Sequence, residues 1–460
     1  MRTFPILTAI LLLAGSCSSA PHTPVEPASK AATARRIVVV VSIDGLIPAS
    51  YLDPETHGLR VPTLRQLRSG GAYSEGAISV FPTVTYPAHT SMVTGVNPGV
   101  HGIIANHAWD PYRRNQEGWN WYAESIRVPT LWQVAERAGV RTALVHWPAS
   151  VGAQVHALVP DFWRAKTQED VKLSRAVSTP GLLDRVATRF PGFWDYYEPW
   201  KPSDRSAMDV AIHLIESGPP ELMFIHTLKV DQFQHGSGLW SAEAKAQVEE
   251  ADSQLARLMD ALKRTGLWNR TILVVVSDHG FLPVRTRVRP AHVLKELGLT
   301  PRDEDSNLTS WKASLLSADG IAYLYVADEN DGQTKELLHR TFVDLASKPD
   351  SGVERVYQRE EIRARGGDPN AFLAIEASDG FRFSSGYGGE TYTDLGNKGV
   401  HGYSPERPEM RASLLVYGPS VKPGVIAGAR LIDLAPTIAG WLGLAMPGVE
   451  GRALPIVLEE

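Results

Sequence analysis

Short apolar runs alternate with helix-like patterns along most of the chain, and this alternation limits the possible folds more than any other feature does. The apolar runs lie at residues 37–43, 143–146, 222–226, 272–276 and 413–417. Helix-period patterns lie between them, for example at residues 61–68, 128–138 and 242–264. Strands that alternate with helices form a mostly parallel sheet covered by helices on both faces. The sequence therefore predicts an α/β fold.

The length of 460 residues suits one large α/β domain with insertions. We place this domain at residues 36–456 and predict two excursions from its core, at about 154–203 and 301–392. The first is rich in aromatic residues and proline, and the second mixes a short strand at 321–326 with a polar helix and a glycine-rich segment. We expect both excursions to form caps near the functional edge of the sheet.

The N-terminus has the pattern of an export signal, with a basic residue, an apolar run and then small residues within positions 1–20. The apolar run at 6–14 is too short to span a bilayer. The signal ends either after Ala20 or, because residues 13–17 resemble a bacterial lipobox, before Cys17, which would then carry a lipid. Residues 21–35 are typical of a flexible tether.

Cys17 is the only cysteine, so the mature chain forms no internal disulfide. An exported protein without disulfides fits the bacterial periplasm better than a eukaryotic secretory route. We therefore predict a protein of the bacterial periplasm, soluble or anchored to a membrane through Cys17.

The formal net charge is −5, and no long run of Lys or Arg is present. Duplex nucleic acid is therefore not an expected partner. An anionic ligand would have to be attracted locally, and a bound metal ion would do this.

Acidic and histidine residues follow several of the predicted strands. Asp44 follows the first strand directly, Asp278 and His279 follow another, and Asp231 comes shortly after a third. Parallel strands bring their C-terminal ends to one edge, where ligands bind in such sheets. The sequence therefore predicts that these residues meet.

Imidazole and carboxylate groups are ligands that zinc prefers, and a catalytic zinc site keeps one position open. Three protein ligands per ion is thus the expected number. A spacing of four residues puts Asp231 and His235 on one face of a helical turn. Each residue alone also suits a turn, a helix cap or a structural hydrogen bond. The two candidate sets are Asp231, His235 and His401, and Asp44, Asp278 and His279.

A threonine-rich turn at residues 83–91 offers three threonines and one serine as candidate nucleophiles. A hydroxyl nucleophile must be activated by a base or a metal ion. A helix predicted at 88–94 would place backbone N–H groups beside the hydroxyl, where a phosphoryl group binds well. The alternative is that Thr83 and Thr85 only cap this helix, and the chemistry of the residues leaves both possibilities open.

Residues 81–89 (Phe-Pro-Thr-Val-Thr-Tyr-Pro-Ala-His) resemble the nucleophile region of the nucleotide pyrophosphatase/phosphodiesterase family, within the alkaline phosphatase superfamily. The resemblance runs from about residue 37 to 456. Further motifs that are similar to those of the family lie, in order, at residues 41–45, 93–95, 101–103, 147–150, 231–236, 276–280, 399–403 and 431–438.

The resemblance implies two zinc ions, one in each candidate set, with Thr85 between them as the nucleophile and a metal contact. Asn106 occupies the position of an Asn that donates a hydrogen bond to the phosphoryl group. The implied function is hydrolysis of phosphate diesters or pyrophosphate bonds through a covalent phospho-threonine, with a small phosphate ester such as a nucleotide as substrate.

Two departures from the family pattern bear on the substrate. Ala88 stands where the family usually has Asn, and residues 227–230 lack an acidic run that is often present. A periplasmic phosphate monoesterase is the main alternative, because a monoester needs additional positive charge, for which Arg164 and Lys166 are the nearest candidates. A phosphonate or sulfate ester hydrolase and a non-catalytic binding lipoprotein are further alternatives.

Aromatic residues of the first excursion are candidates for a surface that stacks a base or holds a lipid headgroup, with a place in the core as the alternative. They are Trp163, Trp194, Tyr196 and Tyr197.

Overall fold

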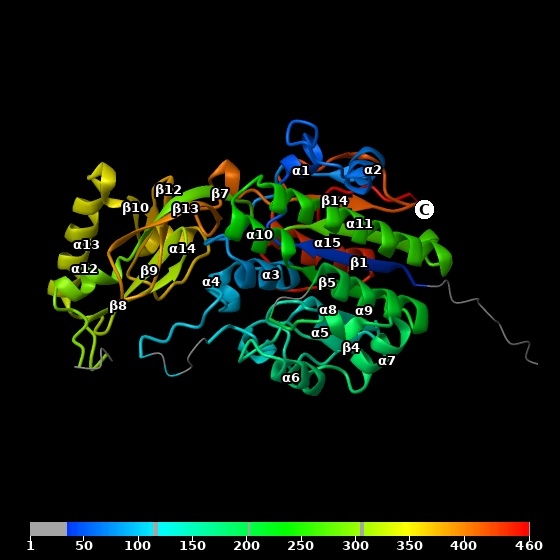
Figure 1. Cartoon of the computed structure of the whole chain (residues 1–460), viewed down its shortest axis with the longest axis horizontal. Coiled ribbons are helices and arrows are strands. Elements are labelled where there is room, and N and C mark those ends of the chain that lie inside the picture. Colours follow the sequence, from blue (N-terminus) through cyan, green and yellow to red (C-terminus); the bar gives the residue numbers. More distant parts are fainter. Residues whose placement is uncertain (1–34, 113, 115–117, 201–202, 304–307, 460) are drawn as a thin grey trace, which may run out of the picture. The chain divides into compact units, whose positions relative to one another are not determined.

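The structure is a computed structural model that describes residues 35–112, 114, 118–200, 203–303 and 308–459 (Figure 1). The predicted export signal, Cys17 and nearly all of the predicted tether lie outside the described residues. Three sheets are present in the described part.

The central sheet has eight strands in the order β15-β2-β14-β6-β1-β5-β3-β4. Its strands are β1 (Ile37–Ile43), β2 (Ala72–Tyr73), β3 (Thr142–Val145), β4 (Ala157–Val159), β5 (Leu222–Thr227), β6 (Thr271–Val276), β14 (Leu414–Tyr417) and β15 (Gly424–Val425). The five strands β6-β1-β5-β3-β4 are parallel to one another, which confirms the predicted fold class.

Helices cover both faces of this sheet (Figure 1). The helices of the structure are α1 (Ala49–Leu52), α2 (Pro62–Gly70), α3 (Thr85–Thr94), α4 (Pro98–His101), α5 (Leu131–Arg137), α6 (Glu169–Val177), α7 (Leu182–Arg189), α8 (Phe193–Tyr196), α9 (Asp204–Ser217), α10 (Lys229–Ser237), α11 (Ala242–Arg264), α12 (Ala291–Glu296), α13 (Gly332–Ala346), α14 (Arg359–Ala364) and α15 (Leu434–Trp441).

Strand β1 shows why the sheet lies between two helical layers. All seven of its residues are buried, and successive side chains point to opposite faces. Val39 and Val41 join the cluster packed against α2, α7, α9 and α11, whereas Val38 and Val40 join the one packed against α3, α5 and α15. A strand buried on both faces reads as a continuous apolar run, which is why the sequence located it without error.

Two sequence predictions about the core need correction. The run at 413–417 was expected to end at the functional edge, but β14 is antiparallel to β6 and begins there. The segment 154–203 was expected to leave the core, yet β4 pairs with β3 in the central sheet. β4 spans three residues, which is too short to give a clear apolar periodicity.

The second and third sheets lie at one end of the central sheet in Figure 1. The segment 301–392 builds a four-stranded sheet, β10-β11-β9-β8, with α13 and α14 against it. The third sheet, β12-β7-β13, follows β6 in the chain and leads to residue 401. The strands of these two sheets are β7 (Leu282–Val288), β8 (Ala313–Ala318), β9 (Ile321–Val326), β10 (Val353–Gln358), β11 (Leu373–Ala377), β12 (Gly380–Phe383) and β13 (Tyr392–Val400).

Across the part of the chain that the structure describes, no helix has both the length and the apolar composition needed to cross a bilayer.

A core substitution tests the two-layer packing of the central sheet. Leu273 on β6 is fully buried in the cluster against α9 and α11, so Leu273→Ala should lower the free energy of unfolding by about 2–5 kcal/mol because it leaves a cavity. Leu173→Ala on α6, where the leucine is 37% exposed, is the matched control and should change it by less than about 1 kcal/mol. Urea unfolding measures both; equal effects would contradict the packing described.

Candidate active site

The sequence-predicted metal ligands meet at the C-terminal edge of the parallel strands. Asp44 follows β1, and Asp278 and His279 follow β6. Asp231 and His235 lie on α10, directly after β5, and the helical turn that the spacing predicted is present. His401 arrives from β13 of the third sheet. The fold thus brings all six candidates from four separate segments to one place.

The first candidate set is compact. Asp231 Oδ1 lies 3.3 Å from His235 Nε2 and 3.6 Å from His401 Nε2. The opposite ring nitrogens, Nδ1 of both histidines, lie 2.9 Å from the carbonyl of Gly399 and 3.0 Å from that of Thr83. A carbonyl only accepts, so Nδ1 carries the proton and the Nε2 lone pair faces Asp231, as a metal ligand requires.

The second candidate set has the same design. His279 Nε2 lies 3.3 Å from Asp44 Oδ1 and 3.1 Å from Asp278 Oδ2, and His279 Nδ1 lies 3.1 Å from the carbonyl of Gly280. The rings of His279 and His401 stack with centroids 3.5 Å apart, so the two sets are neighbours. Ligand atoms of Asp44, Asp231 and His279 also lie within 4.8 Å of one another.

The donor atoms of these sets fit divalent cations. Within the two sets, four fully buried atoms have no hydrogen-bond partner among the described residues. These atoms are Asp44 Oδ1, Asp231 Oδ1, Asp278 Oδ2 and His279 Nε2. Buried carboxylates of this kind are normally paired or coordinate metals, and a three-ligand set of carboxylate and imidazole leaves a position open for substrate.

The electrostatics of the site point the same way. Burial, and then the charge of Asp278, hold the pKa of Asp44 well above its usual range. Burial, and then the imidazoles of His279 and His235, lower the pKa of His401 to about 3. His401 is therefore neutral at physiological pH, the form in which imidazole binds a metal.

One hydroxyl of the threonine-rich turn faces the site. A cavity of ≈ 810 Å³ is lined by Thr85 together with Asp44, Asp231, His235 and His401. The other three candidate hydroxyls do not line it, because each is buried and hydrogen-bonded inside the protein. Thr83 Oγ1 donates to the carbonyl of Tyr403, Thr90 Oγ1 donates to that of Tyr86, and Ser91 pairs with His101.

Comparison with known proteins agrees with this geometry. Residues 38–404 match the family described as type I phosphodiesterase / nucleotide pyrophosphatase. The chain belongs to this family. Its members are metal-dependent phosphodiesterases and nucleotide pyrophosphatases, as the resemblance of the motifs implied.

Curated relatives differ in how much of their length is matched. Rat ectonucleotide pyrophosphatase/phosphodiesterase family member 1 is 27% identical over 252 residues, which cover 53% of this chain and 24% of the relative. An uncharacterized pyrophosphatase/phosphodiesterase of Schizosaccharomyces pombe is 24% identical over 407 residues, covering 84% of this chain and 72% of the relative. The chain thus aligns with about a quarter of the length of the first of these relatives.

Solved structures share the fold. An inactive variant of murine ectonucleotide pyrophosphatase/phosphodiesterase 5, in complex with AMP, superposes with a TM-score of 0.63 at 21% sequence identity. The superposition covers 91% of this chain and 97% of the murine one. This likeness supports the alkaline phosphatase-like α/β fold.

In this chain, Asn106 lies beside the start of α3. Its side-chain oxygen accepts a hydrogen bond from the backbone N–H of Tyr86 at 2.9 Å, so the amide NH₂ is the end left for a ligand. Asn106 lines the cavity with Thr85. The backbone N–H of Tyr86, the first after Thr85, donates to Asn106. This N–H is therefore not free to donate to a phosphoryl group.

Tyr86 and Asp161 form a pair that the sequence analysis missed. The Tyr86 hydroxyl donates to Asp161 Oδ2 at 2.7 Å, and Asp161 lines the cavity while being 5% exposed. Asp161 comes two residues after β4, so it is also a strand-end carboxylate. Its signal was available in the sequence, but β4 was not recognised as a strand of the central sheet.

The sequence analysis also missed two buried histidines that contact the residues of the site. His226 Nε2 lies 3.0 Å from Asp44 Oδ2, and His89 bridges Ser42 and the carbonyl of Thr85 at 2.8 Å each. Such contacts hold the carboxylate of Asp44 and the start of α3 in place. A lone buried histidine carries no signal of this role in the sequence.

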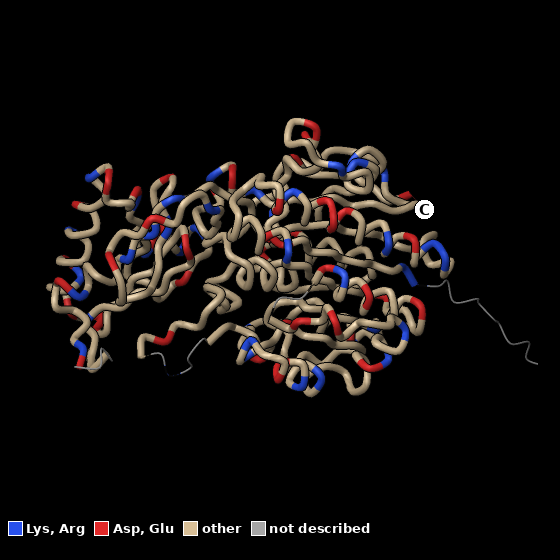
Figure 2. Tube along the Cα trace, in the orientation of Figure 1, with Lys and Arg blue, Asp and Glu red and all other residues tan. Residues whose placement is uncertain are grey.

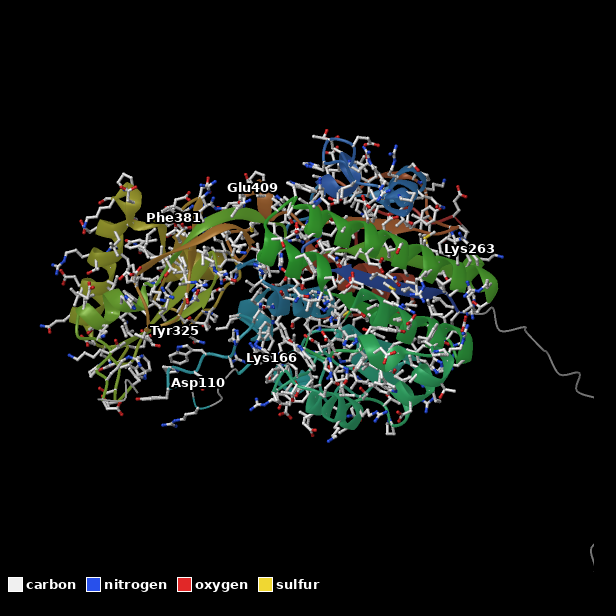
Figure 3. All side chains as sticks on the ribbon, viewed as in Figure 1. Asp110, Lys166, Lys263, Tyr325, Phe381 and Glu409 are labelled. Carbon is white, nitrogen blue, oxygen red and sulfur yellow. The ribbon has the colours of Figure 1, made fainter. Side chains whose placement is uncertain are left out.

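The predicted basic and aromatic candidates separate in space. Lys166, labelled in Figure 3, lines the cavity, whereas the Arg164 guanidinium lies over the ring of Trp121. Trp163 lines the cavity. The other three aromatic candidates, Trp194, Tyr196 and Tyr197, pack around Phe193 in the core.

The buried carboxyl of Asp161 predicts a pH-dependent stability. Burial raises its pKa from 3.8 to about 7, so the folded protein holds the proton more tightly than the unfolded chain does. The resulting stability is complete below about pH 4 and is lost as the pH rises through 7. In chelator-treated protein, Asp161→Asn should therefore gain in Tm over the wild type between pH 5 and pH 9.

Thermal unfolding at a series of pH values measures this difference. Asp350→Asn, at an exposed aspartate, is the matched control and should show no such trend. A Tm difference for Asp161→Asn that does not change with pH would contradict the assignment.

Proposed function

We propose that this chain is a two-metal phosphodiesterase/nucleotide pyrophosphatase with Thr85 as its nucleophile. The observation that carries the proposal is that Thr85 is the one hydroxyl-bearing residue of the threonine-rich turn that lines the cavity, which Asp231, His235, His401 and Asp44 also line. The family match covers residues 38–404, so it includes every residue of the site.

Two zinc ions would be held by the two sets, one by Asp231, His235 and His401 and the other by Asp44, Asp278 and His279. Bound there, zinc supplies Lewis acidity that lowers the pKa of a hydroxyl and stabilises a leaving oxygen. The three buried carboxylates and three imidazoles divide into two sets of three ligands. This number supports two divalent cations rather than one.

Thr85 would form a bond from Oγ to phosphorus while the bond from phosphorus to the leaving oxygen breaks. Its hydroxyl proton is lost in this step, and the leaving group takes up a proton from solvent. Water then hydrolyses the phospho-threonine and restores the hydroxyl. The Asn106 amide would donate to a non-bridging oxygen, because its own oxygen is fixed by Tyr86.

His89 would keep Thr85 in position during both steps. His89 is a fully buried residue of α3. It contacts the Thr85 carbonyl through Nδ1 and Ser42 of β1 through Nε2. The start of α3 is thereby fixed to the strand that carries Asp44. Positioning of this kind contributes to rate because reacting atoms must align within a few tenths of an ångström.

A phosphate diester or a pyrophosphate bond is the proposed substrate linkage, in a small molecule such as a nucleotide. An AMP-bound solved structure of the same fold is consistent with a nucleotide in such a site. A phosphate monoesterase is the second candidate, and the observation that favours it is that Lys166 lines the cavity.

We further propose that residues 1–20 direct export, that residues 21–35 are a tether, and that residues 36–456 are the catalytic domain. Lipidation of Cys17 would anchor the protein to a membrane, and the bacterial periplasm is the proposed compartment. The names of several relatives mark them as ectoenzymes, which is consistent with export.

The nucleophile is tested with Thr85→Ala on thymidine 5′-(p-nitrophenyl phosphate), a nucleotide diester. The variant should lose about 10³-fold or more in kcat, because no other hydroxyl of the turn reaches the cavity. Thr94→Ala is the matched control: Thr94 lies on the same helix, and its hydroxyl is bonded to the Thr90 carbonyl, so activity should stay within about threefold. A Thr85→Ala enzyme with wild-type kcat would overturn the assignment, and a wild-type preference for p-nitrophenyl phosphate would favour the monoesterase.

Metal removal tests the two ligand sets without relying on activity. Zinc-loaded protein should contain about two zinc ions per chain by elemental analysis. His401→Ala and His279→Ala should each bring this number to about one, because each removes one ligand from a different set. Chelation should lower the Tm, since an ion that binds only the folded state stabilises it, and a Tm unchanged by chelator would count against resident metal.

A further inference from the structure

Strand β7 carries arginines on one face only. Arg285 and Arg287 of β7, and Arg289 directly after its end, alternate with Val284 and Val288. The two valines are buried in the cluster that the second and third sheets share. The arginines therefore project from the opposite face of the third sheet.

Arg285, Arg287 and Arg289 form a row of arginines, and Arg382 on β12 extends this row to the cavity. β12 and β7 are parallel, and Arg382 is the register partner of Arg287. The neighbours of Arg382 in the strand, Phe381 and Phe383, pack in the same cluster as the two valines. Arg382 itself lines the cavity that contains Thr85 and the ligand sets.

Like charges placed directly opposite each other on a sheet face are destabilising. Burial, and then the charges of Arg382 and Arg289, lower the pKa of Arg287. The next register partner of Arg287, on β13, is Thr393, whose hydroxyl accepts a hydrogen bond from Arg289 at 2.7 Å. The row thus contains no carboxylate at the positions paired in register.

One carboxylate approaches this row. Asp319, in the turn between β8 and β9, forms an ion pair with Arg382 and also lines the cavity. Among the described residues no other carboxylate forms an ion pair with Arg382, Arg287 or Arg289. Figure 2 shows Lys and Arg segments where Figure 1 labels β7, β12 and β13.

The turn that carries Asp319 adjoins the ligand sets. Asp319 has a left-handed backbone (φ 64°), and the N–H of Gly320 donates to the carbonyl of His401 at 3.1 Å. The Arg382 guanidinium is therefore held on the cavity wall on the His401 side. A planar guanidinium fork in such a place is suited to a phosphate.

We propose that Arg382 at the cavity wall, with the charge of Arg287 beside it, forms a second anion subsite, which binds a phosphoryl group of the substrate other than the one that Thr85 attacks. This inference rests on the proposed function and narrows its substrates to molecules with more than one phosphoryl group. An added phosphate would separate the crowded arginine charges by an opposite charge and compete with Asp319 for Arg382. A single-phosphate diester would leave the subsite unused.

A pair of nucleotide substrates tests the subsite. ATP carries phosphoryl groups in addition to the one that is attacked, whereas the single phosphoryl group of thymidine 5′-(p-nitrophenyl phosphate) is the one attacked. Arg382→Ala should lower kcat/KM for ATP by about tenfold or more, the usual effect of losing a charge-assisted hydrogen bond. It should leave kcat/KM for the diester within about threefold. Arg287→Ala should show the same selectivity with a smaller loss.

Two further variants separate charge from structure. Asp319→Asn keeps a residue that tolerates the left-handed backbone but removes the competing charge, so the ratio of kcat/KM for ATP to that for the diester should rise. Arg340→Ala, at an exposed arginine on α13, is the matched control and should leave the ratio unchanged. Equal losses on both substrates in Arg382→Ala, or a fall of the ratio in Asp319→Asn, would overturn the subsite.

Direct binding distinguishes failure of the subsite from failure of the proposed function. Inorganic pyrophosphate is titrated calorimetrically into zinc-loaded Thr85→Ala protein with and without Arg382→Ala. An increase in Kd of about tenfold or more with Arg382→Ala supports the subsite even if the wild type hydrolyses neither substrate, in which case the proposed function alone fails. An unchanged Kd overturns the subsite even if the wild type cleaves both substrates through Thr85.

Discussion

Three buried carboxylates, those of Asp44, Asp231 and Asp278, meet at the end of the parallel strands, and much of the surrounding structure serves to hold them there. Bringing like charges together away from water is unfavourable unless cations compensate them. The neighbouring protein groups are imidazoles, and His401, which burial holds neutral, adds no positive charge. The arrangement is thus one whose charge is balanced when divalent cations bind, and this balance explains both the buried unpaired oxygens and the metal dependence of the family.

The backbone fixes the direction of each imidazole in this centre. The carbonyls of Gly399, Thr83 and Gly280 hold the Nδ1 atoms of the three histidines of the candidate sets. Glycine is required where these segments meet: a Cβ at Gly402 would lie 1.9 Å from the carbonyl oxygen of Ala318, and one at Gly280 would lie 1.9 Å from that of Glu409. The His-Gly motifs therefore encode close backbone packing as well as ligation.

The third sheet carries both a candidate metal ligand, His401, and Arg382 of the proposed subsite. β13 delivers His401 to the centre, while β12 of the same sheet carries Arg382 at the cavity wall, in register with Arg287 of β7. The turn between β8 and β9 contacts His401 and contributes Asp319. Loops and inserted segments commonly carry the specificity of a fold whose scaffold is shared. The same elements therefore carry both His401 and the residues of the proposed subsite.

The sequence by itself determined the fold class, the strands buried on both faces and the six candidate ligands, because continuous apolar runs and motifs at their ends depend only on local order. β1, α11 and β9 begin and end where their patterns predicted. Only the tertiary structure decided which hydroxyl faces the cavity, that β4 belongs to the central sheet, and that Asp161 and Arg382 line the site. These facts depend on contacts between residues distant in the chain, such as Thr83 with Tyr403 and Arg382 with Asp319, and no local periodicity records such contacts.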